Sequence, residues 1–121
     1  MTETIMDRYI RLFDAAVHDA SALDEMLTLF APEATVEIGQ EPVQGRQAID
    51  AMYRAFVATF SDSKHFCNTT VLEDGSLLGE WVASGRTTDN RVITAAGVER
   101  VKVDGAGRIT DLRNEFTRVP G

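Results

Sequence analysis

The sequence predicts an α+β fold in which three helices precede a curved, mixed or antiparallel sheet. In the first half of the chain, apolar residues recur at spacings of three and four, which is typical of amphipathic helices. In the second half the spacing changes to two, which is typical of strands with one buried face. Turn-forming residues at 73–76 and 104–107 separate the expected strands. Helices grouped ahead of hairpin-connected strands indicate the α+β class.

Three helices are expected before residue 61. The first covers about residues 4–18, and Ser21 is expected to cap the second, which Pro32 prevents from continuing. The third follows a loop at 39–45. The apolar stripes consist of Ile5, Tyr9, Leu12, Phe13, Ala16 and Val17 in the first helix, of Leu23, Met26, Leu27 and Phe30 in the second, and of Ile49, Met52, Tyr53, Phe56, Val57 and Phe60 in the third.

A short strand is expected between the second and third helices, at Ala34–Ile38. Four longer strands are expected at 64–72, 76–87, 91–103 and 108–118, with a further turn at Asp89 and Asn90. A curved sheet wrapped around three helices forms a cone with one open end. Because such a cone is not filled by its own side chains, we expect an internal pocket.

The composition limits the possible functions. A chain of 121 residues fits one domain spanning 1–121, and its net charge of −7 disfavours binding to nucleic acid or to anionic membranes. The single cysteine, Cys67, forms no internal disulfide, and no metal-binding motif is present, so we expect neither metal nor cofactor. The polar start (Met1–Arg8) and the absence of a long apolar run predict a cytoplasmic protein.

Two polar residues fall on apolar faces of expected strands. Glu99 alternates with Val101 and Val103, which places its carboxyl on the inner face. Alternatively, Glu99 lies at a solvated strand end, or Val98 marks the inner face. Asn114 shares a face with Leu112 and Phe116, where it could contact a ligand or be a buried amide satisfied by neighbouring backbone.

Aromatic residues and histidines leave further alternatives. Trp81 is expected in the core, with lining of the pocket as the alternative. Tyr9 and Tyr53 lie on apolar stripes, with their hydroxyls reaching either solvent or the cavity. His18 is expected to cap the first helix, whereas the phase of His65 is ambiguous.

Three segments carry a resemblance to a known family: 29–37, 45–53, and 97–104 followed by 107–109. With them, nearly the whole chain resembles SnoaL-like and ketosteroid isomerase-like proteins of the nuclear transport factor 2-like superfamily. The resemblance implies a cystatin-like cone with an internal cavity. This scaffold hosts isomerases, polyketide cyclases, hydrolases, dehydratases and proteins without known catalysis, so it indicates the fold more strongly than the reaction.

The resemblance also suggests roles for individual residues. Glu99 occupies the place of the late-strand acid that binds an oxyanion in steroid isomerases, and Tyr53 matches a supporting tyrosine. Tyr9 resembles the oxyanion tyrosine, although spacing from the second helix puts Leu12 or Phe13 there instead. Ile38 stands where those enzymes carry the catalytic aspartate, and it cannot accept a proton.

Two functions therefore remain open. The first is an isomerase or cyclase without cofactor that acts on a small, apolar carbonyl or enolisable compound. In it Glu99 and either Tyr9 or Tyr53 are catalytic, and the base is a residue other than 38, for instance His65. The second is a non-catalytic, ligand-binding or structural module. The expected cavity lining consists of Tyr9, Phe13, Ile38, Tyr53, Phe56, Trp81, Glu99, Leu112, Asn114 and Phe116.

The resemblance further implies a homodimer that pairs through the convex face of the sheet. The sequence supports this expectation weakly. Val82 and Val98 fall on the outer face, but so do Glu80, Arg86 and Arg100.

Overall fold

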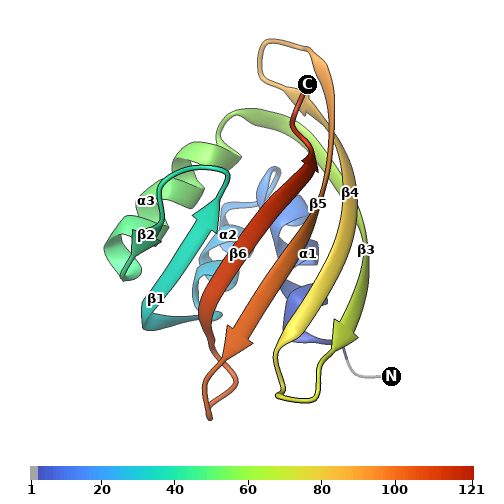
Figure 1. Cartoon of the computed structure of the whole chain (residues 1–121). Coiled ribbons are helices and arrows are strands. Elements are labelled where there is room, and N and C mark those ends of the chain that lie inside the picture. The colour runs from blue at the N-terminus through green and yellow to red at the C-terminus, as the bar shows by residue number, and fades with distance from the viewer. Residues whose placement is uncertain (1–2) are drawn as a thin grey trace.

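The computed structural model describes residues 3–121, so Met1 and Thr2 of the expected domain and of the polar start lie outside the described residues. It confirms the α+β class: three helices pack against a six-stranded sheet (Figure 1). In chain order the elements are α1 (Ile5–Ala16), α2 (Ala20–Leu27), β1 (Phe30–Ile38), β2 (Val43–Gln44), α3 (Arg46–Val57), β3 (Phe60–Val71), β4 (Leu77–Thr87), β5 (Val92–Val103) and β6 (Ile109–Arg118).

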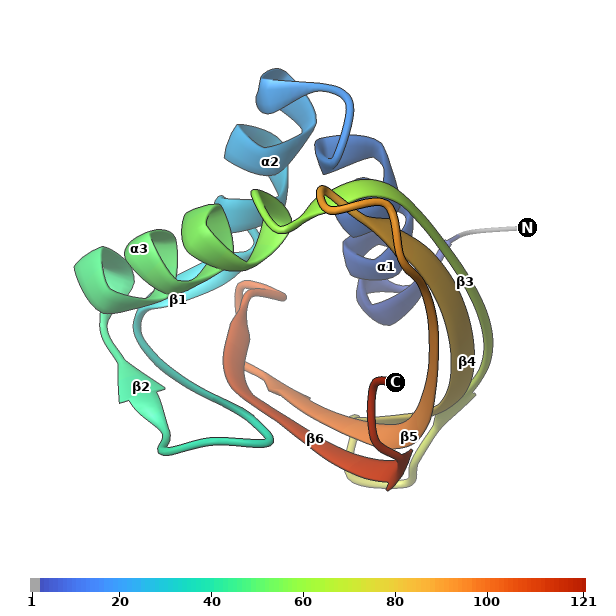
Figure 2. The same ribbon diagram turned by 90° about the horizontal axis from the view of Figure 1, so that it is seen from above.

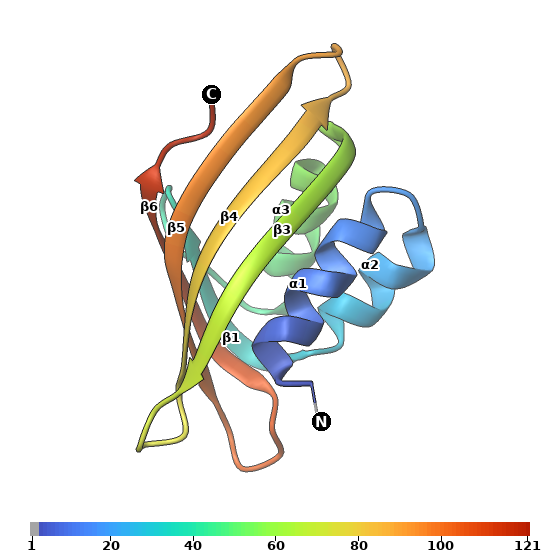
Figure 3. The ribbon, with the colours of Figure 1, turned by 90° about the vertical axis from the view of Figure 1, so that its right-hand side faces the viewer.

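The sheet has the order β2-β1-β6-β5-β4-β3 and is mixed. Strands β3 to β6 form an antiparallel meander, whereas β1 runs parallel to β6, with Val36 opposite Leu112. The long strands bend as they cross the molecule (Figure 3). Seen from above, the sheet forms an arc, and α1 and α3 lie across its open side (Figure 2). This arrangement encloses the space in which the site lies.

The hairpin turns fall where the sequence predicts them. Gly75 and Gly107 have φ angles of 86° and 80°, a backbone region that glycine adopts without strain. The expected turn at Asp89 and Asn90 is also present, with Asn90 at a φ of 70°. Asparagine tolerates this left-handed conformation better than most residues do. The four long strands therefore end within one residue of their predicted limits at these turns.

Several predicted boundaries are wrong. Asp19, not Ser21, caps α2, because its carboxylate accepts the backbone N–H of Ser21 at 2.9 Å. The second and third helices each end about one turn before the last apolar residue of the predicted stripe. Phe30 and Phe60 instead begin β1 and β3, each four residues before the strand predicted there. An apolar residue at the next helical position also fits the inner face of a following strand, so spacing alone cannot separate the two cases.

The core is formed by the apolar stripes of the helices and the inner faces of the strands. Its largest fully buried side chains are Tyr53, Met6, Met26, Ile49, Ile109, Leu112, Val36 and Val101. Burial of each aliphatic side chain contributes about 1.5–3 kcal/mol. Within residues 3–121, no helix has the length and apolar character needed to cross a membrane.

Candidate active site

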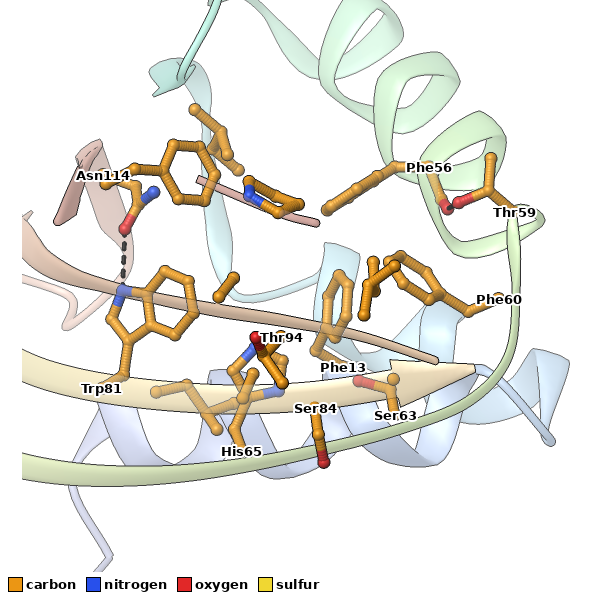
Figure 4. A pocket seen from close by; sticks show the side chains of 18 of the residues that line it. Phe13, Phe56, Thr59, Phe60, Ser63, His65, Trp81, Ser84, Thr94 and Asn114 are labelled. Carbon is orange, nitrogen blue, oxygen red and sulfur yellow. Dashed lines mark hydrogen bonds between the residues drawn. The ribbon is translucent and has the colours of Figure 1, made fainter. Parts of the chain in front are cut away.

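A cavity of about 330 Å³ opens between the helices and the concave face of the sheet (Figure 4). This volume lies within the usual range for small-molecule sites. Aromatic side chains from both helices and sheet form much of its wall, and hydroxyl, imidazole, carboxyl and amide side chains lie between them. Of the residues expected to line it, the structure places eight there: Tyr9, Phe13, Ile38, Phe56, Trp81, Glu99, Asn114 and Phe116.

Tyr53 and Leu112 are not among the lining residues, and both predictions require correction. Tyr53 is completely buried behind Tyr9, because α3 directs Phe56, three residues later, to the cavity instead. Leu112 lies between Val36 of β1 and Val101 of β5, in the filled part of the core. The next residue on the same face of β6, Asn114, lines the cavity.

Glu99 lies on the inner face of β5 and is only 6% exposed. Among residues 3–121 its carboxyl has no hydrogen-bond partner, although it lines the cavity. Burial raises the pKa of Glu99 from 4.5 to about 8, because desolvation disfavours the charged form. At neutral pH the carboxyl is therefore mostly protonated and can donate a hydrogen bond to an oxygen in the cavity.

The hydroxyls of Tyr9 and Tyr53 lie 2.7 Å apart in the core. Burial raises the pKa of each tyrosine well above its usual value, and the charge of Glu99 raises both further when that carboxyl ionises. Both side chains therefore stay protonated. When Tyr53 donates to Tyr9, the proton of Tyr9 is free to donate to a ligand, and Tyr9 is the member of the pair that lines the cavity.

Trp81 and Asn114 form the next polar contact (Figure 4). The indole Nε1 of Trp81 donates to Oδ1 of Asn114 at 2.7 Å. Because an indole only donates, this bond fixes the orientation of the amide. The Nδ2 group of Asn114 is buried and has no partner among the described residues. The alternative that neighbouring backbone satisfies the Asn114 amide is therefore wrong. The Nδ2 group remains an unused hydrogen-bond donor. Asn114 on β6 lies directly opposite Glu99 on β5.

Gly97 allows the Trp81 ring to reach Asn114. A Cβ atom at this position would lie 2.9 Å from the Trp81 ring and 2.7 Å from the backbone oxygen of Glu115. Both distances are shorter than side-chain carbons tolerate, so only glycine lets the indole lie close against β5.

His65 also lines the cavity, which resolves the ambiguous phase of its strand. Its Nδ1 lies 2.7 Å from Oδ1 of Asp14, and its backbone N–H donates to Oδ2 of the same carboxylate at 2.8 Å. The hydroxyl of Ser63 donates to Oδ1 at 2.8 Å. No motif in the sequence marks Asp14 as a site residue. Its only local signal is its spacing of seven residues from Asp7, which places both carboxylates on the face of α1 that meets β3.

His18 takes no part in the site. Helix α1 ends at Ala16, and the exposed His18 ring lies 3.4 Å from Asp62 rather than capping the helix. Across the described part of the chain, no group of three or more His, Cys, Asp or Glu side chains is placed to hold a metal ion.

The sequence of residues 7–112 matches the family model of the SnoaL-like domain. The chain belongs to the SnoaL-like family. Among curated proteins, none matches its sequence.

Solved structures resemble this SnoaL-like protein over nearly its whole length. An NTF2-like protein of unknown function from Exiguobacterium sp. 255-15 is 29% identical, with a TM-score of 0.85 over 93% of this chain and 98% of that one. SalBIII, an epoxide hydrolase/cyclase-like enzyme with a role in pyran ring formation in salinomycin, is 18% identical, with a TM-score of 0.78 over 93% and 87%. Rv0760c from Mycobacterium tuberculosis, solved with estradiol-17β-hemisuccinate, is 18% identical, with a TM-score of 0.76 over 95% of each chain.

Ile38 of this SnoaL-like protein lines the cavity at the end of β1, directly opposite Asn114 on β6. An aliphatic side chain here adds apolar wall and no proton acceptor. Glu37, its neighbour, points to the other face of the sheet, where it lies 3.8 Å from Arg113. The titratable groups that line the cavity are therefore Tyr9, His65, Arg91 and Glu99.

Proposed function

We propose that this SnoaL-like protein is an enzyme without cofactor that isomerises or cyclises a small, mostly apolar carbonyl or enolisable compound. The observation that carries the proposal is Glu99, a buried carboxyl with a pKa raised to about 8 that faces an apolar cavity. A carboxylic acid kept neutral at physiological pH costs less in such a place than a carboxylate does, and it donates a strong hydrogen bond.

Glu99 would act on the oxygen of the substrate. As a proton leaves a neighbouring carbon, negative charge develops on the carbonyl oxygen, and donors already directed at that position stabilise it. Tyr9, supported by Tyr53, supplies a second donor. Removal of one such donor typically lowers the rate by about 10²–10³-fold.

The direct test compares Glu99→Leu and Glu99→Gln with the parent protein. Leucine removes the donor, whereas glutamine keeps an N–H that replaces it in part. We expect exchange of the acidic protons of cyclic enones into D₂O to fall most in Glu99→Leu and less in Glu99→Gln. Glu80→Gln, on the exposed face of β4, is the matched control and keeps the parent rate. Full activity of Glu99→Leu would contradict the proposal.

A second candidate is a binding module without catalysis. Ile38 favours it, because the position that carries the base in steroid isomerases holds no acceptor here. NMR titration of the Glu99 carboxyl separates the two functions. A raised pKa together with Glu99-dependent proton exchange supports the enzyme, whereas ligand binding without exchange, and an ordinary pKa, supports the module.

We also propose that the protein is cytoplasmic and that two copies pair through the outer face of the sheet. Phe66 and Val82 lie directly opposite each other on β3 and β4 and are 65% and 54% exposed. Apolar side chains on a face that also carries Glu80 and Arg100 fit an interface of mixed character. Sedimentation equilibrium is expected to give twice the chain mass, and a monomer mass at micromolar concentration would contradict the pairing.

A further inference from the structure

We propose that Asp14 and His65 supply the base that residue 38 does not, with Nε2 of His65 moving the proton and Asp14 acting as its positioning residue. The inference rests on the proposed function, because it assigns the proton-transfer step of the same cavity. Three observations carry it: the 2.7 Å contact between Asp14 and His65, the place of His65 in the cavity wall, and the free second ring nitrogen.

The contact with Asp14 selects one form of the imidazole. A carboxylate accepts a hydrogen bond, so the neutral ring carries its proton on Nδ1 and keeps the lone pair on Nε2. Among residues 3–121, Nε2 of His65 has no hydrogen-bond partner. An Asp–His pair with this geometry holds the ring in orientation and stabilises the imidazolium that forms when Nε2 takes a proton.

The pair is also held rigidly. Asp14 accepts three hydrogen bonds, two of them from His65 and one from Ser63. The His65 ring packs against Phe13 and Trp81, with ring centroids 5.5 Å and 5.4 Å away. A base held by both polar and aromatic contacts needs little reorganisation during the reaction.

The register of the sheet separates the base from the acid. His65 pairs with Ala83, which pairs with Ala95 on β5, four residues before Glu99. Along β4 and β5, the paired residues Trp81 and Gly97 lie between the level of His65 and the level of Glu99. A substrate whose oxygen contacts Glu99 therefore presents its acidic C–H several bonds away, beyond the Trp81 ring. This arrangement favours a conjugated carbonyl compound, in which a C–H distant from the oxygen is still acidic.

The proposed steps balance without any co-reactant. Nε2 takes a proton from the saturated carbon next to the C=C bond of a conjugated ketone. The C–H electron pair becomes a new C=C bond, the π pair of the original C=C bond moves to form a C=C bond with the carbonyl carbon, and the carbonyl π pair moves to the oxygen. That oxygen accepts the hydrogen bond of Glu99. The proton, or a deuteron that has exchanged onto Nε2, then returns to carbon at either end of the conjugated system, and the carbonyl reforms.

Asp14 could instead serve only to stabilise the packing of α1 against β3. The chain offers a matched control for such a structural role. Asp7, two turns earlier on α1, accepts a hydrogen bond from the Thr69 hydroxyl of β3 at 2.7 Å. Neither Asp7 nor Thr69 lines the cavity. Asp7→Asn thus weakens the same helix–strand contact without touching the proposed base.

The experiment follows deuterium incorporation into isophorone, an apolar conjugated ketone, by ¹H NMR in D₂O at saturation. We expect His65→Ala to lower the rate about 100-fold or more, with partial recovery when imidazole is added, and Asp14→Asn to lower it at least about tenfold. Binding of 2-naphthol, a phenol that places an oxygen at Glu99, is measured by quenching of Trp81 and should not change in Asp14→Asn, because Asp14 does not line the cavity. Asp7→Asn should keep the parent rate.

Two sets of results overturn the inference. One is a parent-like rate in His65→Ala, or equal losses in Asp7→Asn and Asp14→Asn. The other is binding of 2-naphthol that depends on Glu99, together with no deuterium exchange in the parent protein. That result would support the contact between Glu99 and the ligand oxygen and contradict the assignment of His65 as the base. If 2-naphthol binding does not depend on Glu99 and no exchange occurs, the proposed function fails as well.

Discussion

Replacing Glu99 with glutamine should remove a pH dependence of stability that the buried carboxyl imposes. In the unfolded chain the carboxyl ionises near its ordinary pKa of 4.5, whereas in the folded protein its pKa is about 8. Between these values the folded state holds one more proton than the unfolded state. The free energy of unfolding therefore falls as the pH rises through this window, and it does not change further above about pH 8 on account of this group.

The size of the effect follows from the same two values. One pKa unit corresponds to about 1.4 kcal/mol, so the full window amounts to roughly 5 kcal/mol, and the part between pH 5 and pH 8 to roughly 3–4 kcal/mol. Glutamine resembles the neutral acid in shape and does not ionise. The stability of Glu99→Gln relative to the parent should rise by that amount between pH 5 and pH 8.

Urea denaturation of both proteins at each pH unit from 5 to 8 measures this difference. Glu80→Gln serves as the control, because its side chain is exposed and lies outside the cavity. A difference between Glu99→Gln and the parent that stays constant across the range would refute the reasoning. It would mean that Glu99 is solvated or paired in solution.

Three further substitutions test the contacts around the cavity. Trp81→Phe leaves Oδ1 of Asn114 without its donor, so we expect a loss of about 1–3 kcal/mol in urea denaturation and weaker binding of 2-naphthol by calorimetry. Tyr53→Phe removes the hydroxyl contact with Tyr9 and should cost about 1 kcal/mol, with a lower rate of isophorone exchange. Gly97→Ala forces a methyl group against Trp81 and should lower stability by about 1–3 kcal/mol by the same assay. Parent-like stability in all three would show that these contacts do not hold the site together.

Local periodicity was enough to predict much of the fold and part of the cavity. The pleat of a strand fixes which side chains share a face, so the alternation around Val101 correctly places Glu99 inside. The helical stripes likewise identify Tyr9 and Phe56 as inward residues. These positions depend only on spacing within one element, which the sequence displays directly.

The remaining features depend on contacts between distant elements. Asp14 meets His65 across 51 residues of chain, and no pattern near either residue specifies that pairing. Leu112 and Asn114 share one face of β6, yet one is in the filled core and the other at the cavity. The difference arises where the helices cease to cover the sheet, which is a property of the assembled layers and not of the strand.

The parallel pairing of β1 with β6 also has a consequence for how the chain folds as it is synthesised. In order of appearance β6 comes after every other element, but in the sheet it lies between β1 and β5. While β6 is still inside the ribosome, β1 has only the two-residue β2 beside it, and the apolar stripes of the early helices have no complete surface to cover. Nascent chains of this protein should therefore stay sensitive to protease, and available to chaperones, until β6 has emerged.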